Sequence, residues 1–109
     1  MSDDVLQRLA ATVHGRRTED ASKSYTRELL DAGPERCAKK LGEEATETVI
    51  AALGQDARAL TREAADLLYH LVVLLESRHV PLSDVMAELE ARMGTSGHAE
   101  KSARGKKAQ

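Results

Sequence analysis

The stretch EAADLLYHLVVLL, residues 63–75, is apolar on nearly every side of a helical wheel. A helix of this composition is buried by neighbouring helices or by a partner chain. Two acids, Glu63 and Asp66, nevertheless share an arc with its leucines and valines. An uncompensated buried carboxylate is strongly unfavourable, so such groups are paired, protonated or bound to a metal. Two explanations are open at this point: a metal ion, or pairing with Arg36, Arg62 or a lysine.

The rest of the chain is predicted to be helical as well, since no stretch alternates strictly enough for a strand. Ser24 and Asp56 suit helix starts, Gly33 suits a helix end, and Pro34 and Pro81 suit first turns. We expect a loop over residues 15–24 and helices over about 3–14, 25–32, 34–53, 56–78 and from 81 onward. The expected fold class is all-α, an antiparallel bundle of about five helices.

The 109 residues predict one domain, residues 1–93, followed by a tail over 94–109. The tail, GTSGHAEKSARGKKAQ, has no large apolar residue and is expected to be disordered and mildly basic. The remaining core is thin, because small domains bury less of their surface and two tyrosines are the only aromatic residues. We therefore expect a homodimer that completes the bundle.

Composition excludes several classes of function. A net charge of −2 and the scarcity of aromatic residues argue against nucleic-acid binding. The longest nearly uncharged stretch, residues 67–75, is about half of what a membrane span needs. The single cysteine, Cys37, excludes an internal disulfide framework and a zinc site of several cysteines. With no signal-peptide pattern at the start, a cytoplasmic location is expected.

A second acidic group lies on the helix expected over 34–53. Glu43, Glu44 and Glu47 span an arc of about 100°, roughly opposite the apolar side. That apolar side carries Ala38, Leu41, Ala45, Val49, Ala52 and Leu53. Taken alone, this pattern favours a solvated acidic face, with Lys39 and Lys40 as partners for the glutamates.

The two acidic groups are placed to meet. Glu44 and Glu47 are three residues apart, as are Glu63 and Asp66, so each pair shares a helix face. Glu47 is eight residues before Gln55 and Glu63 eight after it, so an antiparallel turn there brings the pairs together. Four carboxylates at one place repel unless divalent cations lie between them, and all-oxygen ligands suit Mg²⁺ or Mn²⁺.

These residues also carry a family resemblance. EEATE (residues 43–47) and EAAD (residues 63–66) match the E-E-x-x-E … E-x-x-D signature of the all-α nucleoside-triphosphate pyrophosphatases. The run SYTRELLDAGPERCAKKLGEEATETVIAAL … EAADLLYHLVVLLESRHVPLSDVMAELEAR, within residues 24–92, resembles one branch, the phosphoribosyl-ATP pyrophosphohydrolases of histidine biosynthesis. The resemblance implies Mg²⁺-dependent hydrolysis of phosphoribosyl-ATP to phosphoribosyl-AMP and pyrophosphate by a helical dimer.

The resemblance also implies roles for single residues. Glu44, Glu47, Glu63 and Asp66 correspond to the Mg²⁺ ligands, whereas Glu43 either binds metal or orients a water. One of the three glutamates of the first motif would act as the catalytic base.

Basic and aromatic residues near these motifs have less specific roles. Arg36, Lys39 and Lys40 lie within two turns before the acids and are expected to hold the substrate phosphates. Tyr69 and His70 also match the branch, and their place in the most apolar helix favours a packing or dimer-interface role.

Two other functions fit the residues. One is a house-cleaning nucleoside-triphosphate pyrophosphatase of the same superfamily, acting on damaged or free nucleotides. The other is a non-enzymatic helical module whose acidic face docks a basic partner.

Overall fold

The computed structural model describes residues 4–94 and is all-α, as predicted. The helices are α1 (Val5–Gly15), α2 (Tyr25–Ala32), α3 (Pro34–Gly54), α4 (Ala57–Ser77) and α5 (Leu82–Met93). No strand occurs within the described part, and the predicted helix limits are correct to within about two residues. The predicted disordered tail lies, from residue 95 on, outside the described residues.

The loop between α1 and α2 is more ordered than the sequence suggests. It contains two short 3₁₀ helices, η1 (Arg16–Thr18) and η2 (Ala21–Lys23). The carboxylate of Asp20 accepts a hydrogen bond from the Ser22 backbone N–H at 3.0 Å, which caps η2. Local side-chain bonds of this kind compete with regular periodicity, so the pattern of apolar residues gave no sign of them.

Side-chain caps define the starts of three helices. Asp4, Ser24 and Asp56 accept hydrogen bonds from backbone N–H groups in the first turns of α1, α2 and α4, at 2.9, 3.1 and 2.8 Å. Each satisfies a donor that would otherwise lack a partner at the helix end. Gly33 joins α2 to α3 with φ of 96°, a conformation that favours glycine, so the two helices follow each other without a loop.

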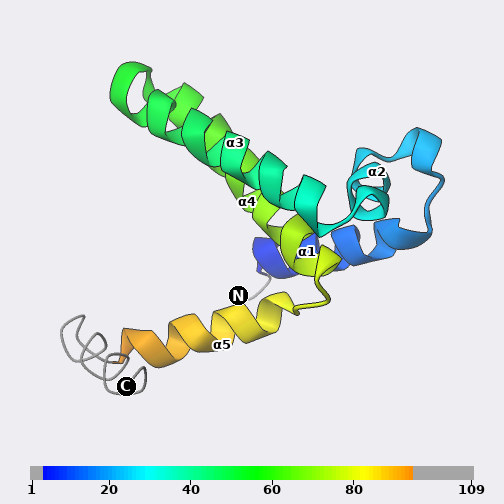
Figure 1. The fold of residues 1–109 in the computed structure, drawn as a ribbon. Helices are drawn as coiled ribbons and strands as arrows, with labels where there is room; N and C mark the ends of the chain where they lie inside the picture. The colour runs from blue at the N-terminus through cyan, green and yellow to red at the C-terminus, as the bar shows by residue number, and fades with distance from the viewer. Residues whose placement is uncertain (1–3, 95–109) are drawn as a thin grey trace, which may run out of the picture.

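Helices α3 and α4 form a long antiparallel hairpin, with α1 and α2 packed beside its open end and α5 diverging from it (Figure 1). The core lies at that open end and consists of Val13, Leu29, Cys37, Val72 and Val73. The buried Cys37 thiol donates to the Leu29 carbonyl at 3.3 Å and so joins α3 to α2. The hairpin tip is exposed to solvent. The acidic residues lie along α3 and α4 between the core and this tip.

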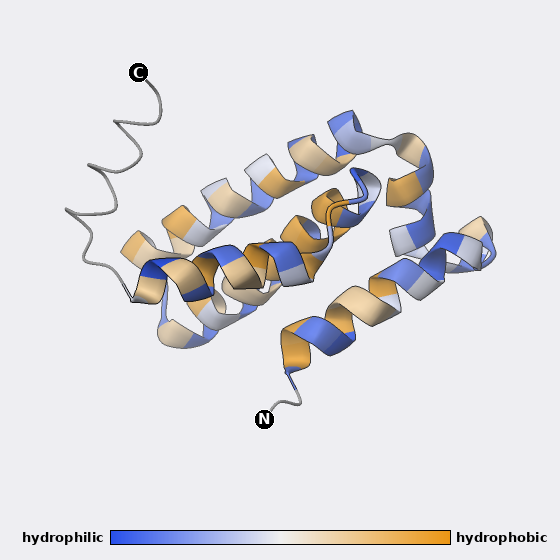
Figure 2. Cartoon of the chain, turned by 90° about the horizontal axis from the view of Figure 1, so that it is seen from below, coloured by the Kyte–Doolittle hydropathy of each residue, from blue (hydrophilic) through white to orange (hydrophobic). Residues whose placement is uncertain are grey.

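Each helix carries hydrophobic and hydrophilic residues along its length (Figure 2). Near the C-terminal end of α3, large apolar side chains are not covered by the rest of the chain: Val49, Ile50 and Leu53 are 57%, 54% and 84% exposed. We call these three residues the α3 patch. No helix in the described part is long and apolar enough to cross a membrane.

Candidate active site

Three of the predicted acids converge between α3 and α4. Glu44, Glu63 and Asp66 each offer a carboxylate oxygen, and these oxygens lie within 4.8 Å of one another. Glu44 is buried, Glu63 is half-buried and Asp66 is exposed. The antiparallel hairpin therefore brings Glu44 close to Glu63 and Asp66, as the spacing around Gln55 predicts. The site is buried at Glu44 and open to solvent at Asp66.

Glu63 is the least satisfied of the three. Its Oε1 is buried and has no hydrogen-bond partner within residues 4–94. Partial burial raises the pKa of Glu63, and the negative charges of the three acids around it, Glu47 foremost, raise it further. Within the described residues no ion pair joins Glu63 or Asp66 to Arg36 or Arg62. The donor set and the orphaned oxygen fit a divalent cation with oxygen ligands.

The first motif divides into glutamates with different surroundings. Glu44 is 8% exposed, which departs from the solvated face that periodicity alone favours. Glu47 is exposed and lies outside the group of three, although its charge acts on Glu63. Glu43 is exposed and pairs with Lys40, at 3.3 Å between Oε1 and Nζ. Periodicity thus describes Glu43 and Glu47 well and fails at Glu44, because α4 covers it.

Of the three predicted phosphate-binding residues, Lys40 lies closest to the acids. Its hydrogen bond with Glu43, followed by the nearby Tyr25, raises the pKa of Lys40. Arg36 is one turn before Lys40 on the same helix face and, like Lys39, is exposed. All three stay predictions as substrate-binding residues.

Thr48 is a residue of the site that the sequence did not reveal. Its hydroxyl donates to the Glu44 carbonyl at 2.8 Å and lies 3.2 Å from the Glu63 carbonyl. It thus joins the two backbone turns that carry the facing acids. No spacing rule marks it, because a threonine bonding four residues back in a helix is common.

An aromatic cluster adjoins the site on the side of α2. His70 is 6% exposed, and its Nδ1 lies 2.8 Å from the carbonyl oxygen of Asp66. The Tyr69 hydroxyl bonds with Thr26, and the Tyr69 and His70 rings meet edge to face at 4.8 Å. Both residues contact other parts of their own chain, and the choice between a packing and a dimer-interface role stays a prediction.

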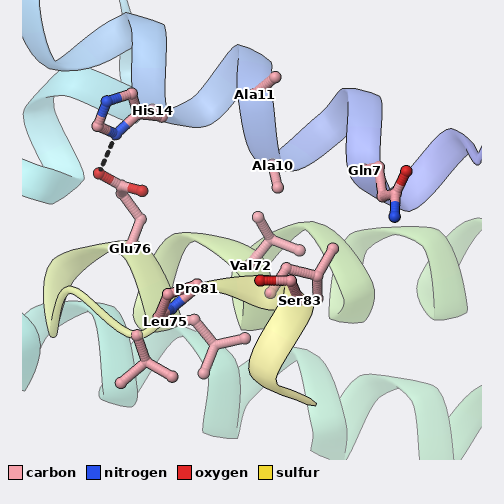
Figure 3. Close-up of a pocket in the computed structure, with 11 residues that line it drawn as sticks. Gln7, Ala10, Ala11, His14, Val72, Leu75, Glu76, Pro81 and Ser83 are labelled. Carbon is pink, nitrogen blue, oxygen red and sulfur yellow. Dashed lines mark hydrogen bonds and ion pairs between the residues drawn. The ribbon is translucent and has the colours of Figure 1, made fainter. Parts of the chain in front are cut away.

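The molecule also has a cavity of about 350 Å³ away from the acids, between α1, α4 and the start of α5 (Figure 3). Its α4 residues are Val72, Leu75 and Glu76, at least six positions after Asp66. Glu76 is held there by His14, at 2.9 Å, and by Arg17. The cavity is mostly apolar, and none of Glu44, Glu63 and Asp66 lines it.

Comparisons with known proteins identify the family of this chain. Residues 6–93 match the family model described as phosphoribosyl-ATP pyrophosphohydrolase. A phosphoribosyl-ATP pyrophosphatase of Cereibacter sphaeroides is 57% identical over 101 residues, covering 93% of this chain and 98% of that protein. Proteins of the same name from Rhodobacter capsulatus and Jannaschia sp. are each 56% identical, over 92% and 91% of this chain and 97% of their own length. The chain therefore belongs to the phosphoribosyl-ATP pyrophosphohydrolase family.

Proposed function

We propose that this chain hydrolyses phosphoribosyl-ATP between the α and β phosphates, releasing phosphoribosyl-AMP and pyrophosphate, as the second step of histidine biosynthesis. The observation that carries the proposal is the convergence of Glu44, Glu63 and Asp66 in a chain that matches this family over residues 6–93. A cytoplasmic location goes with it, since the substrate is an ATP-derived metabolite.

The acids are proposed to hold Mg²⁺, with Mn²⁺ as the alternative ion. Glu44, Glu63 and Asp66 supply the group of three oxygens, and Glu47, which faces Glu63, completes the set. A divalent ion bound there would offset the charge of the phosphate oxygens and of the departing pyrophosphate. The buried Oε1 of Glu63, which lacks a donor among the described residues, supports its place as a ligand.

The remaining residues would bind and orient the substrate. Lys40 stands beside the acids with Arg36 one turn away, so both can meet phosphate oxygens, with Lys39 further round the helix. Glu43 is the glutamate of the first motif outside the proposed ligand set, and we assign to it the role of taking a proton from the attacking water. Lys40 pairs with Glu43 at 3.3 Å, which holds the two side chains beside each other.

The test is pyrophosphate release from phosphoribosyl-ATP with Mg²⁺ and with EDTA, beside dUTP, dCTP and ATP. We expect Mg²⁺-dependent release that is fastest with phosphoribosyl-ATP. Comparable rates with ordinary triphosphates would indicate a house-cleaning enzyme instead. If no nucleotide is hydrolysed and Mg²⁺ does not raise the melting temperature, a non-enzymatic module is the better description.

We further propose that the chain is a homodimer that covers the α3 patch. Large apolar side chains this exposed on one side of a helix indicate an interface. In light-scattering measurements Val49→Asp should shift the mass from dimer to monomer. Val5→Asp is the matched control, because Val5 is 66% exposed but lies on α1. A dimer that survives Val49→Asp would place the interface elsewhere.

A further inference from the structure

Tyr25 is an aromatic side chain left on the surface of a chain that has few of them. The sequence has two tyrosines, no tryptophan and no phenylalanine. Tyr69 is half-buried, whereas Tyr25 is 46% exposed at the first position of α2. A large apolar ring in this position offers a contact area that folding has not used.

The Tyr25 ring is nevertheless held in place. It stacks on Tyr69 with centroids 6.5 Å apart and planes inclined by 22°. The edge of His70 approaches at 6.1 Å, at 75° to the Tyr25 ring. A ring supported in this way loses little conformational freedom when a ligand binds to its open side.

His70 also determines the direction of the hydrogen bond of the Tyr25 hydroxyl. The Asp66 carbonyl can only accept a hydrogen bond, so His70 Nδ1 carries the proton and donates at 2.8 Å. In the tautomer with the proton on Nδ1, Nε2 is an acceptor, and the Tyr25 hydroxyl faces it over a long 3.4 Å. The phenol oxygen is left with lone pairs only. These lone pairs can accept hydrogen bonds from amino or hydroxyl donors of a ligand.

A hydrogen-bond chain and the nearby charge of Lys40 place Tyr25 at the rim of the acidic site. Through His70 it joins the backbone of Asp66, one helical turn away on α4. On the α3 side it lies near Lys40, whose ammonium pairs with Glu43 at 3.3 Å. The ring therefore stands where the non-phosphate part of a bound nucleotide would extend.

We propose that Tyr25 binds the purine base of the nucleotide substrate by stacking, and that His70 is the positioning residue that holds the ring. The inference rests on the proposed function, which supplies a substrate with a base and phosphates. In this arrangement the cation-binding acids and Lys40 bind the phosphates of the substrate, and Tyr25 binds its base.

Tyrosine fluorescence can test this directly, because the chain has no tryptophan to mask it. In Tyr69→Phe the only emitter is Tyr25, and in Tyr25→Phe it is Tyr69. With Mg²⁺ present, AMP should quench Tyr69→Phe saturably and leave Tyr25→Phe unchanged, after correction for absorbance by AMP. Ribose 5-phosphate, which has no base, should quench neither. Equal quenching of both variants by AMP, quenching of neither, or equal quenching by ribose 5-phosphate would overturn the proposal.

Kinetics provide a second measurement that does not depend on the Tyr69 variant. Tyr25→Leu should raise KM for phosphoribosyl-ATP by roughly 5- to 100-fold with little change in kcat, since stacking is made equally in ground and transition states. Tyr25→Phe keeps the ring and should stay within about threefold of wild type in KM, since stacking supplies most of the contact. His70→Gln should raise KM without lowering kcat. An unchanged KM in Tyr25→Leu would contradict the proposal.

The two proposals fail in different ways. If wild type releases no pyrophosphate from phosphoribosyl-ATP, the proposed function is wrong, and the AMP titration still reports on Tyr25. If wild type is active and AMP does not quench the Tyr69→Phe protein, only the inference about Tyr25 is wrong.

Discussion

Two glutamates of α4, Glu63 and Glu76, are thirteen residues apart and both half-buried, yet their surroundings are opposite. Burial disfavours ionisation of both. At Glu76, hydrogen bonds from Arg17 and His14 outweigh it and lower the pKa. At Glu63 the neighbours are other carboxylates, and the pKa is raised. Glu76 is thus neutralised by its own chain and ties α4 to α1 and η1, whereas the charged groups that act on Glu63 are carboxylates, which disfavour its ionised form.

The largest expected effect of this contrast is on catalysis. Glu63→Gln should lower the rate of pyrophosphate release more than about 100-fold. Loss of a residue that only supports a metal ligand from the outer shell lowers activity by at most about 100-fold, and loss of a ligand should have a larger effect. Glu76→Gln should stay within a few-fold of wild type, because it contacts none of the acidic group. Initial rates at saturating Mg²⁺ measure both. Near wild-type turnover in Glu63→Gln would remove Glu63 from the ligand set.

Stability in EDTA should change in the opposite sense. Glu76→Gln loses the charge-assisted hydrogen bonds that its carboxylate accepts from His14 and Arg17, and should lower the free energy of unfolding by about 1–2 kcal/mol. Glu63→Gln removes repulsion between clustered carboxylates and should raise the melting temperature. Urea and thermal unfolding followed by circular dichroism check the two variants together. A loss of stability in both would mean that Glu63 is a structural residue.

The same contrast has a pH dependence of known sign. The pKa of Glu76 is lowered in the fold, so its contribution is complete above its ordinary value of 4.5 and is lost as pH falls below it. The gap between wild type and Glu76→Gln should therefore close on acidification. The pKa of Glu63 is raised, so wild type should lose stability relative to Glu63→Gln as pH rises above 4.5. Urea unfolding in EDTA between pH 3 and 7 measures both gaps. Parallel gaps at all pH values would exclude ionisation as the cause.

The sequence predicts one half of this comparison much better than the other. Glu63 is conspicuous because an acid in an apolar helix needs an explanation, and its spacing from Asp66 puts both on one face. Glu76 has no such signal. Its partners Arg17 and His14 are 59 and 62 residues away, and only packing brings them together.

Periodicity has a similar limit on α3. It predicts a helix with an apolar side, and the caps and glycine at the helix ends fix the boundaries. It does not tell whether that side is covered by its own chain, and in the α3 patch it is not. Nor does it predict that α4 covers Glu44, because burial depends on where the neighbouring helix lies.

The smallest expected effect concerns how the acids are held, and it is centred on Thr48. Its hydroxyl meets the carbonyls of Glu44 and Glu63, so it holds the two turns in register without touching a carboxylate. Thr48→Val keeps the shape but loses the donor, which should destabilise the fold by about 1 kcal/mol. A shift of the facing acids should also lower kcat about 3- to 10-fold, since small misplacements slow an oriented reaction. Thr48→Ser restores the donor and should recover most of the rate. If Thr48→Val keeps the kcat of wild type, the hydroxyl does not position the acids, and helix packing alone places the acids of α3 and α4.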